Sequence, residues 1–96
     1  MRIISKKTLK DFWEKEPVAK PSLEAWHAEA KSADWASPAD VKANYGSASI
    51  LKDGRAVFNI GGNKYRLIAS IHFNRSKVYV RHVLTHVEYD RGSWKK

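Results

Sequence analysis

Four side chains in the second half of the sequence are of types that together could cleave RNA: Arg66, Arg81, His86 and Tyr89. Histidine titrates near neutral pH, so it could give a proton to a leaving oxygen, and the forked donors of arginine suit a phosphate. Tyrosine offers a ring for stacking and a hydroxyl. Around one concavity, these groups would suffice for attack of a ribose 2′-hydroxyl on the adjacent phosphorus without a metal ion.

The same residues also have a purely structural interpretation. His86 follows the end of a predicted strand and precedes Tyr89 by three residues. A loop or first-turn position there could overlook a polar sheet face, but His86 could equally be an ordinary helix residue beside solvated arginines. Spacing alone favours neither interpretation.

We expect neither a metal site nor a cofactor. The chain has no cysteine, which excludes disulfides and thiolate ligands. Two of its four histidines, His82 and His86, are four residues apart, but strand parity predicts that His82 faces the core. His27 is predicted to lie at a helix surface or boundary.

Three strands must position these side chains. Apolar runs at 55–60, 64–73 and 77–84 are separated by Gly61-Gly62-Asn63 and Asn74-Arg75-Ser76. Gly and Asn accept the positive φ angles of tight turns, so the pattern predicts an antiparallel meander.

Strand alternation assigns the side chains to two faces of this meander. The predicted core face carries Tyr65, Leu67, Ala69, Ile71, Phe73, Val78, Val80, His82 and Leu84. The other face is predicted to carry Arg66, Tyr79 and Arg81, joined by Asn59 from the first strand.

The rest of the chain reads as helices that cover one face of the sheet. Arg2-Ile3-Ile4 predicts a short edge strand, and Ser5 is expected to cap the first helix through its hydroxyl. The predicted helices span 6–16, 22–32 and 38–44, and a short one follows Thr85, which forms a capping-box spacing with Glu88. We expect a loop at 47–54 and a frayed polar end at 91–96. Trp13, Trp26 and Trp35 are expected in the core. The result is an α+β fold in one domain, 1–96.

The charge of the chain is +8 and lies mostly in its second half. Residues 1–50 carry eight basic and seven acidic residues, a net of +1, whereas residues 51–96 carry ten and three, a net of +7. This asymmetry predicts a polyanionic partner, such as nucleic acid or the ribosome. No apolar run approaches the length of a membrane span, so we expect a cytoplasmic protein without a membrane partner.

The runs VFNIGGNKYRLIASI (57–71) and VYVRHVLTHVEYD (78–90) strongly resemble the HigB family of bacterial toxins, within the RelE-like superfamily. The resemblance extends over nearly the whole chain. It implies helices packed on one face of an antiparallel sheet. It also implies cleavage of mRNA, usually in the ribosomal decoding site, with a 2′,3′-cyclic phosphate as product. The implied partner is a helix-turn-helix antitoxin, HigA, and the complex would repress its own operon.

The resemblance also suggests roles for single residues. Arg66 matches the sheet arginine that acts on the scissile phosphate, and His86 and Tyr89 match the region of acid/base and stacking residues. Arg81 and Asn59 match the family pattern with less defined roles. The further residues that we expect to bind RNA are Arg55, Asn63, Lys64, Lys77 and Tyr79. The general base stays open among His86, a deprotonated Lys64 and water aided by substrate alignment.

Two other functions remain possible at this point. A toxin of similar fold could inhibit a protein target, as gyrase-poisoning relatives do, and would not need His86. A non-catalytic basic module could bind RNA or DNA with a steep salt dependence and no cleavage. An antitoxin for a face this basic is expected to neutralise it with an acidic segment or to cap it sterically.

Overall fold

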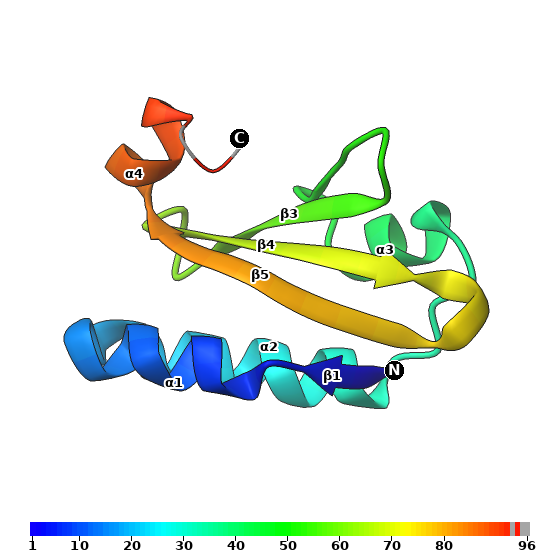
Figure 1. Ribbon diagram of the computed structural model, residues 1–96, viewed down its shortest axis with the longest axis horizontal. Helices are drawn as coiled ribbons and strands as arrows, with labels where there is room; N and C mark the ends of the chain where they lie inside the picture. The colour runs from blue at the N-terminus through cyan, green and yellow to red at the C-terminus, as the bar shows by residue number, and fades with distance from the viewer. Residues whose placement is uncertain (93, 95–96) are drawn as a thin grey trace.

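Three long strands form the centre of the fold in the computed structural model, which describes residues 1–92 and 94 (Figure 1). They are β3 (Arg55–Ile60), β4 (Tyr65–His72) and β5 (Lys77–Thr85), each antiparallel to the next. The predicted meander is therefore confirmed.

Residues with positive φ make both connections of the meander possible. Gly61, Gly62 and Asn63 have φ values of 63°, 63° and 74°. The second connection is a 3₁₀ turn, η2 (Phe73–Arg75), closed by Ser76 at φ 54°. Glycine and asparagine tolerate this region better than other residues, which is why the first turn could be predicted from its composition.

Two short edge strands complete a sheet of order β1-β5-β4-β3-β2. The predicted N-terminal strand, β1 (Arg2–Ile4), pairs with β5 in parallel, so the sheet is mixed rather than wholly antiparallel. The expected loop at 47–54 was partly wrong, because β2 (Ser49–Ile50) pairs with the start of β3. A turn at 51–54 joins these two strands, with Gly54 at φ 83°.

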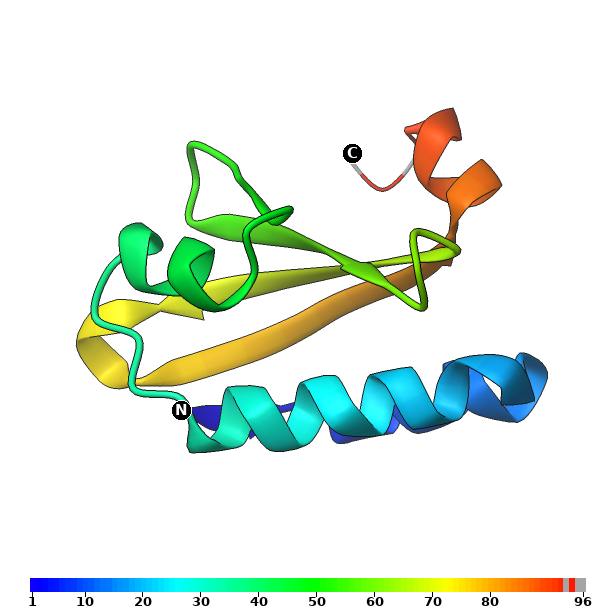
Figure 2. The same ribbon diagram turned by 180° about the vertical axis from the view of Figure 1, so that it is seen from behind.

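The helices lie on two sides of the sheet. Long helices α1 (Lys6–Lys15) and α2 (Lys20–Ser32) cover one face, joined by the 3₁₀ turn η1 (Pro17–Ala19) (Figures 1 and 2). Helix α3 (Pro38–Asn44) lies at one end of the sheet, and α4 (His86–Arg91) lies at the other end, on the side away from α1 and α2. No helix in the described part of the chain is long and apolar enough to cross a membrane.

The main core lies between the sheet and α1 and α2. Trp26 and Trp35 are almost fully buried in it, and the Trp26 ring meets Phe58 of β3 edge-on at 5.4 Å between centroids. Trp13 packs against this core while remaining partly exposed. The prediction of a core built on tryptophans is thus confirmed, and burial of these large rings contributes strongly to the hydrophobic free energy of folding.

Two helix starts differ from the prediction. Ser5 precedes α1, but it has φ 76° and its hydroxyl makes no cap, so its carbonyl oxygen accepts from the Thr8 amide instead. Helix α2 begins at Lys20, two residues before the predicted start. Pro21 is tolerated there because first-turn amides have no partner within the helix.

A β-bulge in β5 corrects the predicted faces of its second half. Ile68 pairs with His82, whereas the next residue of β4 pairs with Val80, so Arg81 is an extra residue in β5. The alternation shifts by one from there. Val83 therefore enters the core, and His82, which we predicted to face the core, is exposed on the opposite face. Leu84 also changes face.

The capping box predicted at Thr85 is confirmed. The Glu88 amide donates to Thr85 Oγ1 at 3.2 Å, and the Thr85 amide donates to Glu88 Oε1 at 2.9 Å. Gly92 ends α4 in the left-handed region at φ 74°. The predicted frayed end at 91–96 was wrong at Arg91, which belongs to α4, and at Trp94, which is buried with only 7% of its surface exposed. Residues 93 and 95–96 of that prediction lie outside the described residues.

Candidate active site

The sheet face turned away from α1 and α2 carries nearly all the predicted site residues. Cross-strand pairing arranges it in rows. From α4 outward they are Asn59–Arg66–Leu84, Val57–Ile68–His82 and Arg55–Ser70–Tyr79. We call this surface the polar face, although its centre is apolar at Val57 and Ile68. Asn59 lies on this face, as predicted from parity, and it pairs directly with Arg66.

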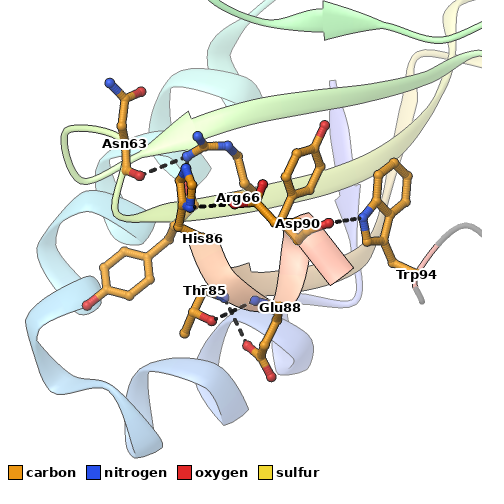
Figure 3. A network of polar contacts seen from close by, with 9 residues as sticks. Asn63, Arg66, Thr85, His86, Glu88, Asp90 and Trp94 are labelled. Carbon is orange, nitrogen blue, oxygen red and sulfur yellow. Dashed lines mark hydrogen bonds and ion pairs between the residues drawn. The ribbon is translucent and has the colours of Figure 1, made fainter. Parts of the chain in front are cut away.

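Arg66 is held in place from two directions. Its Nη1 donates to the carbonyl oxygens of Asn63 at 2.9 Å and Tyr65 at 3.2 Å (Figure 3). Its Cζ lies 5.5 Å from the centre of the Tyr89 ring, a cation–π distance. Because Nη1 is taken by the backbone, the remaining guanidinium N–H groups can bind a phosphate with little loss of side-chain entropy.

His86 is the first residue of α4 and lies at the same end of the sheet as Arg66. Its amide donates to the Lys64 carbonyl at 3.1 Å, and the capping box between Thr85 and Glu88 fixes the first helical turn, which contains His86. Its Nδ1 lies 2.9 Å from Asp90 Oδ2, one helical turn later (Figure 3). With Nδ1 bound to a carboxylate, Nε2 is the nitrogen left for a substrate, and the imidazole is about half exposed.

Tyr89 connects Arg66 to Trp94, which is near the end of the chain. The Tyr89 and Trp94 rings are stacked, with centroids 5.1 Å apart and planes 12° apart. Arg55 Cζ lies 5.6 Å from the Trp94 ring, and its Nε forms an ion pair with Asp53 at 2.7 Å. Trp94 also packs on Val57 and Ile68.

Trp94 was missed as a site residue in the sequence. Its signal was weak: a single aromatic residue within a basic end, just beyond the glycine that stops a helix. Its role depends on where the chain returns after Gly92. His82 was missed as well, since the bulge that exposes it has no local sequence marker.

Arg81 lies in a second cluster farther along the polar face. Its Nε donates to Ser70 Oγ at 3.0 Å, and its Cζ lies 5.5 Å from the Tyr79 ring. Tyr79 in turn meets the His72 ring edge-on at 5.0 Å. Ser70 is four residues beyond Arg66 in β4, about 13 Å along the strand. Arg66, His86 and Tyr89 are thus gathered at one end, whereas Arg81 is grouped with Tyr79.

The other residues expected to bind RNA surround these two clusters. Asn63 and Lys64 are exposed in the turn beside His86, and Asn59 donates to the Ser47 carbonyl at 3.4 Å. Lys77 is at the far end, opposite His72 and next to Arg2 of β1. A shallow recess beside the stacked rings is lined by His82, Leu84, Glu88, Arg91 and Trp94.

Comparison with known proteins identifies the family. The model of the HigB toxin, described as the RelE-like toxic component of a toxin–antitoxin system, matches residues 19–92. This chain belongs to the HigB toxin family. The match to the HigB model includes Arg66, His86 and Tyr89 and ends before Trp94.

Curated HigB proteins cover the chain more fully. The mRNA interferase toxin HigB of Escherichia coli strain K12 is 39% identical over 92 residues, which are 94% of this chain and 88% of that protein. The mRNA interferase HigB of Shigella flexneri has the same identity and coverage. The mRNA interferase HigB of Escherichia coli O6:H1 strain CFT073 is 29% identical over 93 residues, 95% of this chain and 90% of that protein. The predicted HigB resemblance and the α+β, RelE-like fold are therefore confirmed.

Proposed function

We propose that this HigB family member is the toxin of a toxin–antitoxin pair and an endoribonuclease that cleaves mRNA. The observation that carries the proposal is the gathering of Arg66, His86 and Tyr89 at one end of the polar face. Three relatives with the name mRNA interferase support it. The net charge of +7 on residues 51–96 provides the attraction for an RNA backbone.

In the proposed reaction, the 2′-oxygen of one ribose bonds to the adjacent phosphorus. The bond from phosphorus to the 5′-oxygen of the next nucleotide breaks, leaving a 2′,3′-cyclic phosphate and a 5′-hydroxyl. Arg66 stabilises the negative charge that builds up on the phosphate oxygens. Protonated His86, oriented by Asp90, gives the Nε2 proton to the leaving oxygen. Tyr89 supports Arg66 and offers its edge and hydroxyl to the neighbouring nucleotide.

The contacts of the carboxylate side chains in the second half of the chain bear on which group accepts the 2′-hydroxyl proton. Residues 51–96 contain three, and each already has a partner: Asp53 binds Arg55, Glu88 caps α4, and Asp90 binds His86. A carboxylate base would have to break one of these contacts. We therefore assign the proton to water, with substrate alignment supplying most of the drive for attack.

We further propose that the substrate is mRNA in the decoding site of the ribosome, and that a HigA-type helix-turn-helix antitoxin holds the toxin inactive in the cytoplasm. The supporting feature is the basic polar face, which suits a polyanionic cleft and requires neutralising when the toxin is at rest. An antitoxin that contacts only α1 and α2 would argue against charge neutralisation as the means of inhibition.

The test is cleavage of a defined mRNA by the purified protein, with and without programmed ribosomes. We expect cuts that end in a 2′,3′-cyclic phosphate and are lost in a His86→Ala variant, whereas Lys10→Gln on the opposite side of the molecule keeps full activity. Cuts in free RNA would remove the ribosome from the proposal. Toxicity in cells without cleavage, unchanged by His86→Ala, would instead indicate a protein target, and tight salt-sensitive binding without cleavage or toxicity a non-catalytic module.

A further inference from the structure

Four side chains form one continuous stack across the polar face. Arg66 lies over the Tyr89 ring, the Tyr89 ring is nearly parallel to the Trp94 ring, and Arg55 lies over the Trp94 ring. The separations are 5.5, 5.1 and 5.6 Å in that order. The stack, which we call the arginine–aromatic column, therefore has one cation at each end.

Trp94 is held at the polar face by a hydrogen bond and by apolar contacts. Its Nε1 donates to the Tyr89 carbonyl at 3.0 Å, and its ring packs on Val57 and Ile68 in the centre of the polar face. Removal of the ring would take away the surface on which the Arg55 guanidinium lies and the ring that stacks on Tyr89. Trp94 thus links the two ends of the column.

The two cations extend from well-separated backbone positions on the polar face. Arg55 pairs with Ser70 of β4, four residues from Arg66, so their backbones are separated by about 13 Å along the sheet. For comparison with this separation, successive phosphates on one strand of a regular duplex are about 3.4 Å apart along the helix axis, so the two arginines are placed to reach different phosphates. Each guanidinium also keeps N–H groups that its protein partners, Asp53 for Arg55 and two carbonyls for Arg66, do not use.

We propose that Trp94 is a positioning residue of the RNA site, which holds Arg55 and Arg66 at the two ends of the column so that they bind two different phosphates of one RNA strand. This inference depends on the proposed function for its ligand, RNA. It assigns Trp94, which lies after α4 and takes no part in the proposed chemistry, to substrate binding.

A simpler role for Trp94 would be to cover the apolar centre of the polar face. The two roles predict different results for two substitutions. Trp94→Leu keeps apolar contact with Val57 and Ile68 but removes the stacking ring. Trp94→Phe keeps a ring for stacking but removes the Nε1 donor. Covering alone would be satisfied by either residue, whereas positioning requires an aromatic ring.

The experiment measures the dissociation constant of an uncleavable 2′-O-methyl oligoribonucleotide at several salt concentrations. The logarithm of the dissociation constant rises with the logarithm of the salt concentration, with a slope of about 0.7 for each phosphate contact to a single strand. Loss of one phosphate contact therefore lowers this slope by about 0.7. We expect Arg55→Gln to lower the slope by about that amount and to weaken binding about tenfold. Trp94→Leu, which loosens both arginines, should lower the slope by up to about twice that amount and weaken binding at least about tenfold. Trp94→Phe should bind within about threefold of the unmodified protein, since the ring preserves most of the cation–π energy.

A double variant tests whether the column acts as one unit. Residues that act through the same contact show non-additive effects. Arg55→Gln with Trp94→Leu should therefore bind no more weakly than the weaker single variant. Lys10→Gln on α1 should leave the slope unchanged, and thermal unfolding of each variant confirms that it is folded.

Several results would overturn the proposal. They are unchanged binding by folded Trp94→Leu, additive losses in the double variant, and no RNA binding by the unmodified protein. Failure of the proposed function is a distinct result. Binding that follows the expected pattern in a protein that never cleaves RNA would support the column and reject the ribonuclease. Cleavage of RNA by the unmodified protein, together with unchanged RNA binding by Trp94→Leu, would support the ribonuclease and reject the column.

Discussion

At the scale of single residues, the site depends on properties that only arginine and a carboxylate-bound histidine supply. Arg66 stacks on Tyr89 while two backbone carbonyls hold one end of its guanidinium. A lysine has neither the planar surface nor the forked donors needed for both contacts. We therefore expect the planar, forked shape of the side chain at position 66 to be more important than its positive charge alone.

Arg66→Lys is expected to lower the single-turnover rate of RNA cleavage almost as much as Arg66→Gln, by about 100-fold in each case, because charge stabilisation needs a fixed donor. Arg81→Lys, in the second cluster, is the matched control and should cost less than about tenfold. Retention of most of the activity by Arg66→Lys would show that a mobile positive charge is enough.

Asp90→Ala is expected to slow cleavage about tenfold, since unoriented His86 retains only part of the benefit of general acid catalysis. The exposed ion pair itself contributes less than about 1 kcal/mol to folding. The melting temperature should therefore hardly change while the cleavage rate falls. Equal losses of cleavage rate in Asp90→Ala and in Arg91→Ala, a change at its exposed neighbour, would show that Asp90 does not act by orienting His86.

At the scale of elements, the short helix α4 carries His86, the proposed general acid, and its start is defined by the capping box. Thr85→Ala removes the hydroxyl that accepts from the Glu88 amide. We expect it to lower the free energy of unfolding by about 1 kcal/mol and to reduce cleavage through displaced His86. Thr85→Ser keeps the hydroxyl and should behave like the unmodified protein. Urea unfolding of both variants, followed by circular dichroism, measures the difference.

Elements with local signals were predictable and those that depend on pairing were not. The Gly61-Gly62-Asn63 turn and the Thr85–Glu88 box could be identified because the residues themselves favour those conformations. The bulge at Arg81 arises only when β5 is aligned with β4, so parity misassigned His82. Trp94 likewise required knowledge of where the chain goes after Gly92.

At the scale of the whole molecule, the sheet separates a nearly neutral helical half from a strongly basic half. The first 50 residues, which form α1, α2 and α3, have a net charge of +1, and the rest has +7. A substitution on the helical side can thus change the free energy of unfolding of the protein without changing RNA binding by the basic side. A titratable group on the helical side provides a test of this separation.

His27 of α2 supplies that group. Burial, together with Lys6 of α1 and Lys31, lowers the pKa of His27 from its ordinary value of 6.5. Above pH 6.5 the imidazole is neutral in both states, so its contribution to stability is complete there. As the pH falls below 6.5, the unfolded chain binds a proton first, and stability is lost until the lower pKa of the folded state is reached.

His27→Gln should therefore reduce the loss of melting temperature between pH 7 and pH 5. Thermal unfolding of this variant and of the unmodified protein across this range measures the difference. RNA cleavage by His27→Gln at neutral pH should be normal, because α2 covers the face of the sheet opposite the polar face (Figures 1 and 2). Parallel melting curves for His27→Gln and the unmodified protein would contradict the prediction.

The central claim, that His86 protonates the leaving oxygen and Arg66 stabilises charge, is tested most directly with an RNA whose scissile 5′-oxygen is replaced by sulfur. Sulfur leaves without a proton, so a missing general acid no longer matters. We predict that His86→Ala cleaves ordinary RNA about 10²- to 10⁴-fold slower than the unmodified protein. It should cleave the sulfur-containing RNA at nearly the normal rate, while Arg66→Gln stays slow on both. Equally slow cleavage of both RNAs by His86→Ala would contradict the account.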